Sequence, residues 1–348
     1  MKLALSCPAP VAACRICGNS TNSTYWRVRE MLHGTGELFD YVKCGACGCL
    51  QIAPIPRDLG RYYPRDYFSF RSFDHLARGR LRRMIDCKRV QHSLERRNLI
   101  GWILNPVARP LDYLTWVQKA GLNTAARVLD VGCGNGKVLL RMRLGGFQQV
   151  TGVDPFIRKT IAYPNGVTIH KLTLEAFAGE YRQPFDLIMF HHSLEHMVDP
   201  QGALKTAASM LSERGSILVA VPVADSEACE RYRENWANLD APRHLHLFTR
   251  NSMAILARNA GLAVTHAESA GLVSQFTASE LYRRGIAGNA RRSAAEFLSK
   301  REIEEFRTMT ARLNREGRGD QVMFYLRRPA DVSQMVTADP LSINSPAH

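Results

Sequence analysis

A glycine-rich turn in the middle of the chain limits the fold more than any other feature of the sequence. The apolar run Val128–Val131 leads directly into the turn 132–136, which reads Gly-Cys-Gly-Asn-Gly, and a helical apolar pattern follows from Lys137. Glycine lets the backbone turn sharply, and the N-terminus of a helix offers free N–H groups and positive potential. This order of strand, turn and helix predicts a nucleotide-binding site in a doubly wound α/β sheet.

A second predicted strand brings an acidic residue to the same edge of the sheet. The segment Gln149–Val153 has the pattern of a strand and ends at Asp154, eighteen residues after Gly136. A carboxylate at the tip of the second strand is suited to accept hydrogen bonds from both hydroxyls of a ribose. The ligand predicted by these two strands therefore contains a nucleoside.

The sequence resembles the class I S-adenosylmethionine-dependent methyltransferases. The resemblance rests on LDVGCGNG at residues 129–136, on Asp154, and on the ending LEH-x-x-DP at residues 194–200, which follows a buried strand at 185–190. That ending is similar to the small-molecule branch of the family. The resemblance covers about residues 120–328 and implies an α/β, Rossmann-like, seven-stranded methyltransferase sheet. Its last two strands are expected at 263–267 and 322–326, with the last strand antiparallel.

The resemblance implies S-adenosylmethionine as the cofactor. Asp130, before the first glycine, is suited to the cationic amino group of the methionine part. Adenine recognition is expected at the backbone of Leu174, because Thr173 stands where an acidic residue is more usual in the family. The expected cofactor-binding residues are Asp130, Gly132, Cys133, Gly134, Gly136, Asp154, Pro155, Thr173, Leu174 and His191.

Histidines gather after two of the predicted strands, on the edge where the cofactor is expected. His192 and His196 follow the strand at 185–190, and His244 lies after the strand at 216–222. Methyl transfer to a hydroxyl or to a carbon acid is helped by a general base, and histidine titrates closest to neutral pH. We expect His244 to be this base, with His192 and His196 as alternatives. A packing or capping role stays open for each of them.

The N-terminal region contains two Cys-x-x-Cys pairs separated by 26 residues. An odd total of nine cysteines, without a secretion signal, argues against a disulfide scaffold. Four thiolates match a closed, structural Zn²⁺ site, and unrelated thiols are the alternative. The expected ligands are Cys14, Cys17, Cys44 and Cys47, with Cys49 as a substitute for Cys47. Some sugar C-methyltransferases also begin with a four-cysteine zinc module; they have a tyrosine where this chain has Ala241.

These motifs divide the chain into four parts. We expect a zinc-binding module at 1–70, a basic helical connector at 71–119, a methyltransferase domain at 120–328 and a disordered tail at 329–348. A helical insertion is expected within the methyltransferase domain at about 274–318, where it would cover the substrate pocket.

The net charge of +14 favours an anionic partner. Within the connector, residues 78–109 hold nine cations against two carboxylates, and this stretch forms either a solvated helix face or a contact with an anionic membrane. Arg243 is expected to bind an anionic substrate group or to form a structural salt bridge. We expect a small, anionic acceptor such as a sugar or a lipid-linked precursor. A nucleic-acid methyltransferase and a non-catalytic cofactor-binding module are the alternatives.

The sequence also gives an expectation for the compartment. No apolar run approaches the roughly 18 residues of a membrane helix, and the first residues are too short for the apolar part of a signal peptide. These observations predict a cytoplasmic protein, with peripheral contact to the inner face of the membrane as an option for the connector.

Overall fold

The computed structural model describes residues 13–63, 70, 73–77, 80–95, 103, 111–288 and 294–329. Cys7, four of the nine cations at 78–109 and the predicted tail after residue 329 lie outside the described residues. Within the described part, none of the helices has the length and apolar character that a membrane crossing requires.

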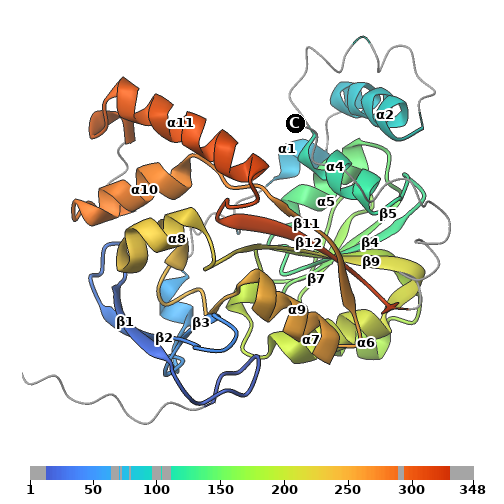
Figure 1. The fold of residues 1–348 in the computed structure, drawn as a ribbon. Helices are drawn as coiled ribbons and strands as arrows, with labels where there is room; N and C mark the ends of the chain where they lie inside the picture. Colours follow the sequence, from blue (N-terminus) through green and yellow to red (C-terminus); the bar gives the residue numbers. More distant parts are fainter. Residues whose placement is uncertain are drawn as a thin grey trace, which may run out of the picture.

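An eight-stranded sheet forms the centre of the molecule (Figure 1). Its strand order is β11-β12-β9-β8-β4-β5-β7-β6. Pairing is parallel from β9 to β7 and antiparallel for β11, β12 and β6. The strands are β4 (Arg127–Val131), β5 (Gln149–Val153), β6 (Ile161–Ala162), β7 (Thr168–His170), β8 (Phe185–His191), β9 (Leu211–Pro222), β11 (Ala263–Ser269) and β12 (Gln321–Arg327).

This sheet confirms the predicted Rossmann-like fold and adds one strand to it. Seven strands correspond to the predicted ones, and β12 is antiparallel to its neighbours as expected. The eighth strand, β6, has only two residues and pairs with the outer side of β7. A segment this short has no pattern of alternating side chains, so the sequence does not reveal it.

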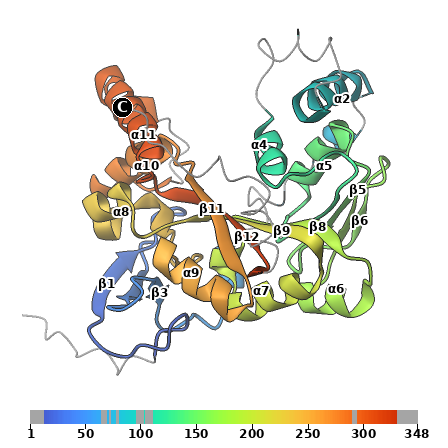
Figure 2. The ribbon, with the colours of Figure 1, turned by 45° about the vertical axis from the view of Figure 1, so that its right-hand side comes forward.

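Helices cover both faces of the sheet, because its central strands are buried on both sides. In β4, Leu129 belongs to one apolar core and Val128 to the other. Figure 2 shows these two layers of helices above and below the sheet. The layer on the side of Leu129 contains α6 (Leu174–Glu180), α7 (Pro200–Ser209) and α9 (Arg250–Asn259). The layer on the side of Val128 contains α1 (Asp74–Ala77), α2 (Arg80–Glu95), α4 (Asp112–Lys119) and α5 (Lys137–Leu144).

The first described residues form a small antiparallel sheet of order β1-β2-β3-β10. We name residues 13–63 the cysteine module. It supplies β1 (Thr24–Arg29), β2 (Leu38–Lys43) and β3 (Leu50–Ile52), whereas β10 (His246–Leu247) comes from the predicted methyltransferase domain. The module therefore does not complete its own sheet, although the sequence predicts a domain boundary at residue 70.

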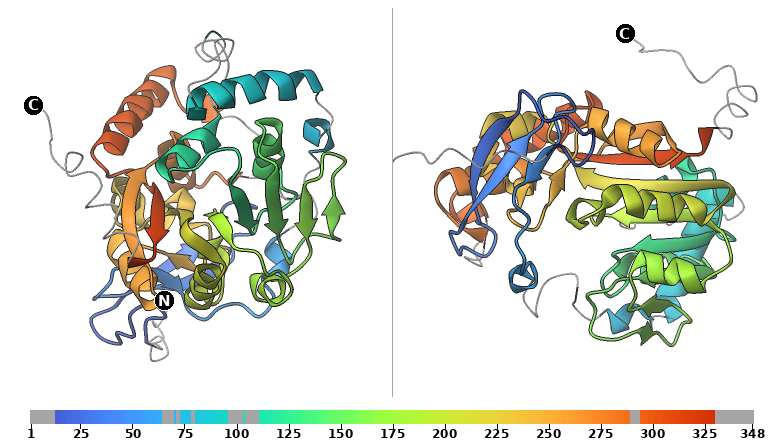
Figure 3. Two further views of the ribbon diagram at one scale, coloured as in Figure 1. Left: turned by 90° about the vertical axis from the view of Figure 1, so that its right-hand side faces the viewer. Right: turned by 90° about the horizontal axis from the view of Figure 1, so that it is seen from below.

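A third apolar core joins the cysteine module to the C-terminal helices. Trp26 and Tyr41 of the module pack in one cluster with Trp236, Phe276 and Phe306. Figure 3 (right) shows the blue strands of the module beside the orange helices. The helices around this core are α8 (Glu227–Tyr232), α10 (Ser274–Arg283) and α11 (Lys300–Arg315), with short 3-10 turns at Arg233–Asn235 and Ala237–Leu239. Helices α10 and α11 lie in the segment where the sequence predicts a helical insertion.

Candidate functional site

The glycine turn lies between the C-terminal end of β4 and the start of α5. Gly132, Gly134 and Gly136 have φ values of 73°, 54° and 75°, in the left-handed region that favours glycine. A Cβ at Gly132 would lie 2.5 Å from the Cβ of Ser193, and a Cβ at Gly136 would lie 2.5 Å from Cδ1 of Ile169. The backbone conformation favours glycine at both positions, and at Gly132 the packing against Ser193 requires it as well.

Asp154 lies at the tip of β5 and is already held toward the turn. One carboxylate oxygen accepts a hydrogen bond from the backbone N–H of Gly134 at 2.8 Å, and the other accepts one from Phe156 at 2.8 Å. Burial raises the pKa of Asp154, and these backbone donors act in the opposite direction. Each oxygen can accept a further hydrogen bond, as recognition of two ribose hydroxyls requires.

Asp130 is a buried carboxylate that forms no hydrogen bond with any described residue. Burial and the charge of Asp154 raise its pKa to about 8. Because a buried carboxylate without a partner is costly, a cationic ligand group beside it would be stabilising. The amino group of S-adenosylmethionine fits this requirement, so Asp130 and Asp154 together suit the two ends of that cofactor.

The other predicted cofactor residues lie along the same edge of the sheet. The Cys133 thiol lies 3.8 Å from the carbonyl oxygen of Val153, and Pro155 follows Asp154 directly. The Thr173 hydroxyl accepts a hydrogen bond from the N–H of Ala176 and caps α6, whose first residue is Leu174.

His191, at the end of β8, has an aromatic partner that the sequence does not predict. Its ring lies against Trp116 of α4, with ring centroids 4.8 Å apart. Burial lowers the pKa of His191 to about 3, so this side chain is neutral at physiological pH. The roles of His191 and of the other residues along this edge in cofactor binding stay predictions.

Two of the predicted catalytic histidines lie together where β8 ends. The rings of His196 and His244 have centroids 4.7 Å apart. Nδ1 of His244 lies 2.7 Å from the carbonyl oxygen of Asn238. Because a carbonyl only accepts, Nδ1 carries the proton and Nε2 keeps its lone pair. Burial and the nearby His196 lower the pKa of His244 to about 4, which keeps Nε2 free of a proton at neutral pH.

Glu195 is the acidic centre of this cluster. Its carboxylate is fully buried, and among the described residues neither oxygen has a hydrogen-bond partner. One oxygen lies 3.9 Å from Nε2 of His244 and 3.7 Å from Nδ1 of His192. Burial acts to raise the pKa of Glu195, but the surrounding histidines lower it to about 2. The sequence shows Glu195 within the LEH motif, yet only its burial reveals that it is central to the site.

The remaining two histidines have different surroundings. His192 has a φ of 56°, which is strained for a residue with a side chain, and its side chain is 39% exposed. Nδ1 of His196 lies 2.9 Å from the carbonyl oxygen of Arg243 and 3.0 Å from the hydroxyl of Tyr63. Potential metal-ligand atoms of Glu195, His196 and His244 lie within 4.8 Å of one another, so this group could also hold a cation.

Arg243 forms a structural ion-pair network. Its side chain is buried, its Nε lies 3.0 Å from a carboxylate oxygen of Asp240, and its Nη2 lies 3.0 Å from Glu30. Of the two predicted roles, the geometry favours the salt bridge, because two carboxylates already surround the guanidinium. Glu30 and Asp240 were not predicted as site residues. Glu30 has no sequence signal, because its contact with Arg243 joins positions 213 residues apart, whereas Asp240 lies three residues before Arg243.

The four predicted cysteine ligands converge. Their sulfur atoms all lie within 4.8 Å of one another, with Cys14–Cys47 at 3.7 Å and Cys17–Cys44 at 3.6 Å. Tetrahedral zinc with Zn–S bonds of about 2.3 Å places its sulfur ligands about 3.8 Å apart. These residues therefore fit a structural zinc ion. Cys49 is buried outside this group, so the geometry favours Cys47 as the fourth ligand.

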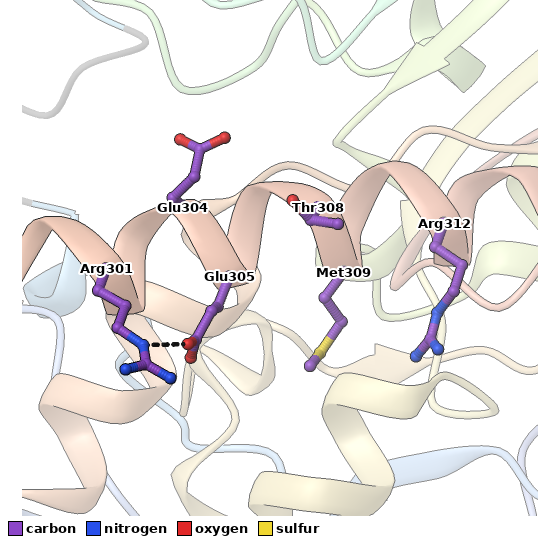
Figure 4. A pocket seen from close by; sticks show the side chains of 6 residues that line it. All are labelled: Arg301, Glu304, Glu305, Thr308, Met309 and Arg312. Carbon is purple, nitrogen blue, oxygen red and sulfur yellow. Dashed lines mark hydrogen bonds and ion pairs between the residues drawn. The ribbon is translucent and has the colours of Figure 1, made fainter.

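A separate hollow of about 570 Å³ lies against α11, away from these clusters. Figure 4 shows charged side chains on this helix, with an ion pair between Arg301 and Glu305. Its lining residues are Arg301, Glu304, Glu305, Thr308, Met309 and Arg312. Exposed ion pairs one helical turn apart are ordinary features of a solvated helix, so the hollow adds no chemistry to the site.

Comparison with known proteins agrees with the geometry of the glycine turn. Residues 107–267 match the family described as methyltransferase domain. This part of the chain is thus similar to methyltransferase domains. The matched segment includes the glycine turn, Asp154 and all four histidines from His191 to His244 that the sequence singles out.

Curated relatives of this methyltransferase domain include enzymes of ubiquinone biosynthesis. The ubiquinone biosynthesis O-methyltransferase of Shewanella sp. (strain ANA-3) is 33% identical over 139 residues, which are 36% of this chain and 58% of the relative. The protein of the same name from Pseudomonas putida (strain GB-1) is 30% identical over 111 residues, 30% of this chain and 47% of the relative. The chain thus spans about half the length of the curated relatives that it matches.

Solved structures are similar to the methyltransferase domain at lower identity. The cyclopropane synthase MmaA2 from Mycobacterium tuberculosis is 18% identical, with a TM-score of 0.38, over 61% of this chain and 83% of that chain. An S-adenosylmethionine-dependent methyltransferase from Mesorhizobium loti is 17% identical, with a TM-score of 0.38, over 63% of this chain and 100% of that chain. Scores of this size add nothing to the family match.

Proposed function

We propose that this protein is an S-adenosylmethionine-dependent methyltransferase whose acceptor is a small molecule with a hydroxyl group or an acidic C–H bond. The observation that carries the proposal is the position of two groups at one edge of the sheet. The glycine turn with Asp130 and Asp154 fits the cofactor, and β8 ends in a buried cluster of Glu195 with His244. The relatives named O-methyltransferase support the same class of reaction.

The chemistry assigns a role to each group. S-adenosylmethionine, when bound, supplies an electrophilic methyl group on a sulfonium. His244 would accept the acceptor's proton at Nε2 as the acceptor takes up the methyl group that the bound cofactor would supply. Glu195 and Asp240, each with an oxygen 3.9 Å from Nε2, stabilise the imidazolium that results. Alignment of the two substrates supplies the remaining acceleration.

We propose that the acceptor is neutral at the reacting end, such as a sugar or another polyhydroxylated molecule. The net charge of the chain predicts an anionic acceptor, but the buried guanidinium of Arg243 is paired with two carboxylates. In the described part of the connector, Arg89 is buried and pairs with Asp86 at 3.3 Å. These carboxylates neutralise both cations, and contact of the remaining connector with an anionic membrane stays a separate proposal.

A labelling experiment tests this function. Purified protein is incubated with methyl-tritiated S-adenosylmethionine and either a protein-free fraction of small metabolites or total RNA. We expect label in the small-molecule fraction with the wild type, and loss of that label with His244→Gln. His266→Gln is the matched control, because His266 lies on the edge strand β11, away from the cluster.

Other outcomes decide between the alternatives. Label in RNA that rises as the salt concentration falls would favour a nucleic-acid methyltransferase. Binding of the cofactor by calorimetry without label in any fraction would favour a cofactor-binding module. Absence of cofactor binding would contradict the proposal.

A further inference from the structure

The loop that carries His244 is built into the sheet of the cysteine module. One residue separates His244 from strand β10. This strand pairs with β3, with His246 opposite Gln51 and Leu247 opposite Leu50. The N–H of Ile52 donates to the carbonyl of Leu245 at 3.1 Å. The backbone next to the proposed base is therefore a strand of a sheet whose other three strands belong to the N-terminal module.

Both cysteine pairs also make hydrogen bonds to this loop. Arg15 lies between the first two cysteines, and its guanidinium donates to the carbonyl of Leu245 at 3.1 Å and to Nε2 of His246 at 2.8 Å. On the other side, the hydroxyl of Thr249 donates to the carbonyl of Cys47 at 2.6 Å. The two Cys-x-x-Cys turns thus contact both ends of the segment from 245 to 249.

Two buried polar residues of the module bind His244 and the residue before it. The Tyr41 hydroxyl donates to the carbonyl oxygen of His244 at 2.8 Å, and Tyr41 is fully buried. Glu30 binds Arg243, the residue before the base, and it also accepts hydrogen bonds from the backbone N–H groups of His33 and Thr35. These hydrogen bonds within its own loop hold the carboxylate of Glu30 in the position from which it binds Arg243.

The cofactor turn is held by different contacts. The N–H of Gly132 donates to the carbonyl of Val153 at 2.8 Å, and the N–H of Gly134 donates to Asp154. These partners belong to β5 and its tip, in the methyltransferase domain. We call the glycine turn with Asp154 the cofactor half of the site, and the cluster of His244 and Glu195 the acceptor half. The two halves therefore depend on separate parts of the chain.

We infer that the cysteine module positions His244, and that metal binding at its four cysteines orders residues 243–249 while leaving the cofactor turn unchanged. The assignment of His244 as the base rests on the proposed function, whereas the coupling between the module and the loop does not. Glu30 and Tyr41 are positioning residues in this scheme, since they bind the backbone of His244 and the side chain of Arg243 and not the proton-accepting Nε2.

Two variants with a matched control test the inference in the full-length protein. Tyr41→Phe removes one hydroxyl, and Glu30→Gln removes one charge. Asp40→Asn is the control, because Asp40 is next to Tyr41 in β2 but forms only an exposed pair with Arg27 at 3.7 Å. The readouts are hydrogen–deuterium exchange of peptides that cover 240–249 and 127–137, the cofactor dissociation constant, kcat and KM.

We expect exchange in 240–249 to accelerate about tenfold in Tyr41→Phe, since one net hydrogen bond corresponds to about that factor. A displacement of about 1 Å costs about a hundredfold in rate, so kcat is expected to fall between about tenfold and a hundredfold in both variants. The cofactor dissociation constant and exchange in 127–137 are expected to stay at wild-type values. Removal of the metal with a chelator should give the same pattern of exchange.

The exchange and calorimetry measurements need no acceptor, so they separate this inference from the proposed function. Unchanged exchange in 240–249 after chelation and in both variants would overturn the inference. Loss of protection in both peptides together would also overturn it, because the module would then support the whole fold. If the loop responds as expected but no acceptor is ever methylated, the proposed function fails and the coupling stands.

Discussion

The two halves of the candidate site are assembled in different ways. The cofactor half comes from the glycine turn and Asp154, which lie within 25 residues of one another in the sequence. The acceptor half joins His244 and Glu195 to Tyr41 and Glu30 of the cysteine module. A site built from neighbouring segments is visible in the sequence, whereas a site built from remote segments becomes visible only in the fold. The following predictions, from the largest effect to the smallest, test this division.

Substitution of the proposed base should affect the acceptor half alone. General base catalysis contributes roughly 10²–10⁴ in rate, so His244→Gln is expected to lower kcat by about that factor. Cofactor affinity, measured by calorimetry, should change less than about twofold, because the contacts of the cofactor turn do not involve His244. If His192→Gln causes the larger fall in kcat, the assignment passes to His192.

Substitution of Asp154 should affect the cofactor half alone. Hydrogen bonds to a charged group contribute about 1.5–3 kcal/mol each, so loss of two ribose contacts in Asp154→Ala is expected to weaken S-adenosylmethionine binding at least about 100-fold. Exchange in the peptide 240–249 should stay at the wild-type rate. Asp58→Ala, in the cysteine module, serves as a control for the loss of an unrelated carboxylate. Unchanged affinity in Asp154→Ala would remove the main support for the cofactor site.

The sequence signals for the proposed cofactor half are local. Positive φ at Gly132 and Gly136, and the carboxylate at the tip of β5, are required by one strand–turn–helix unit and the strand beside it. The two cysteine pairs are also local, and the structure brings their sulfur atoms together as predicted. The same argument explains why the central strands β4 and β8 are predictable, since each one is a largely buried apolar run.

The acceptor half was predicted only in part, because tertiary packing decides it. The sequence singles out His244, but nothing in it indicates that β10 completes the sheet of the module. Glu30 and Tyr41 look like ordinary strand and turn residues until the fold places them against the loop. Arg243 had two possible roles, and only its distance of 3.0 Å from Glu30 separates them.

The pKa of Asp130 gives a pH-dependent test of the cofactor half. Burial and Asp154 raise this pKa to about 8, and a cationic amino group binds the ionised carboxylate. Below pH 8 the carboxyl of Asp130 must lose its proton before the cofactor can bind. Affinity for S-adenosylmethionine should therefore fall by about tenfold per pH unit below pH 8. Above that pH the cofactor loses its own α-amino proton, whose pKa is about 8, and affinity should fall again.

Asp130→Asn is the matched variant for this pH profile. It keeps the shape of the side chain but has no proton to lose, so its affinity should be weaker and level on the acidic side. The measurement is calorimetry from pH 5.5 to about 9.5, a range that spans both titrations. A wild-type profile that is level between pH 6 and about 8 would show that Asp130 is ionised before the cofactor binds.

The smallest expected effect concerns Thr173, for which the sequence and the structure give different roles. The sequence places Thr173 at the adenine, whereas its hydroxyl caps α6 by accepting a hydrogen bond from the N–H of Ala176 at 3.2 Å. Loss of such a cap costs about 1 kcal/mol, so Thr173→Ala should lower the free energy of unfolding by about that amount in urea. Thr173→Ser keeps the hydroxyl and should retain most of the stability. Because the cap directs the hydroxyl toward the backbone of α6, cofactor affinity should be the same in both variants. A weaker affinity in Thr173→Ala alone would show that the hydroxyl also contacts the cofactor.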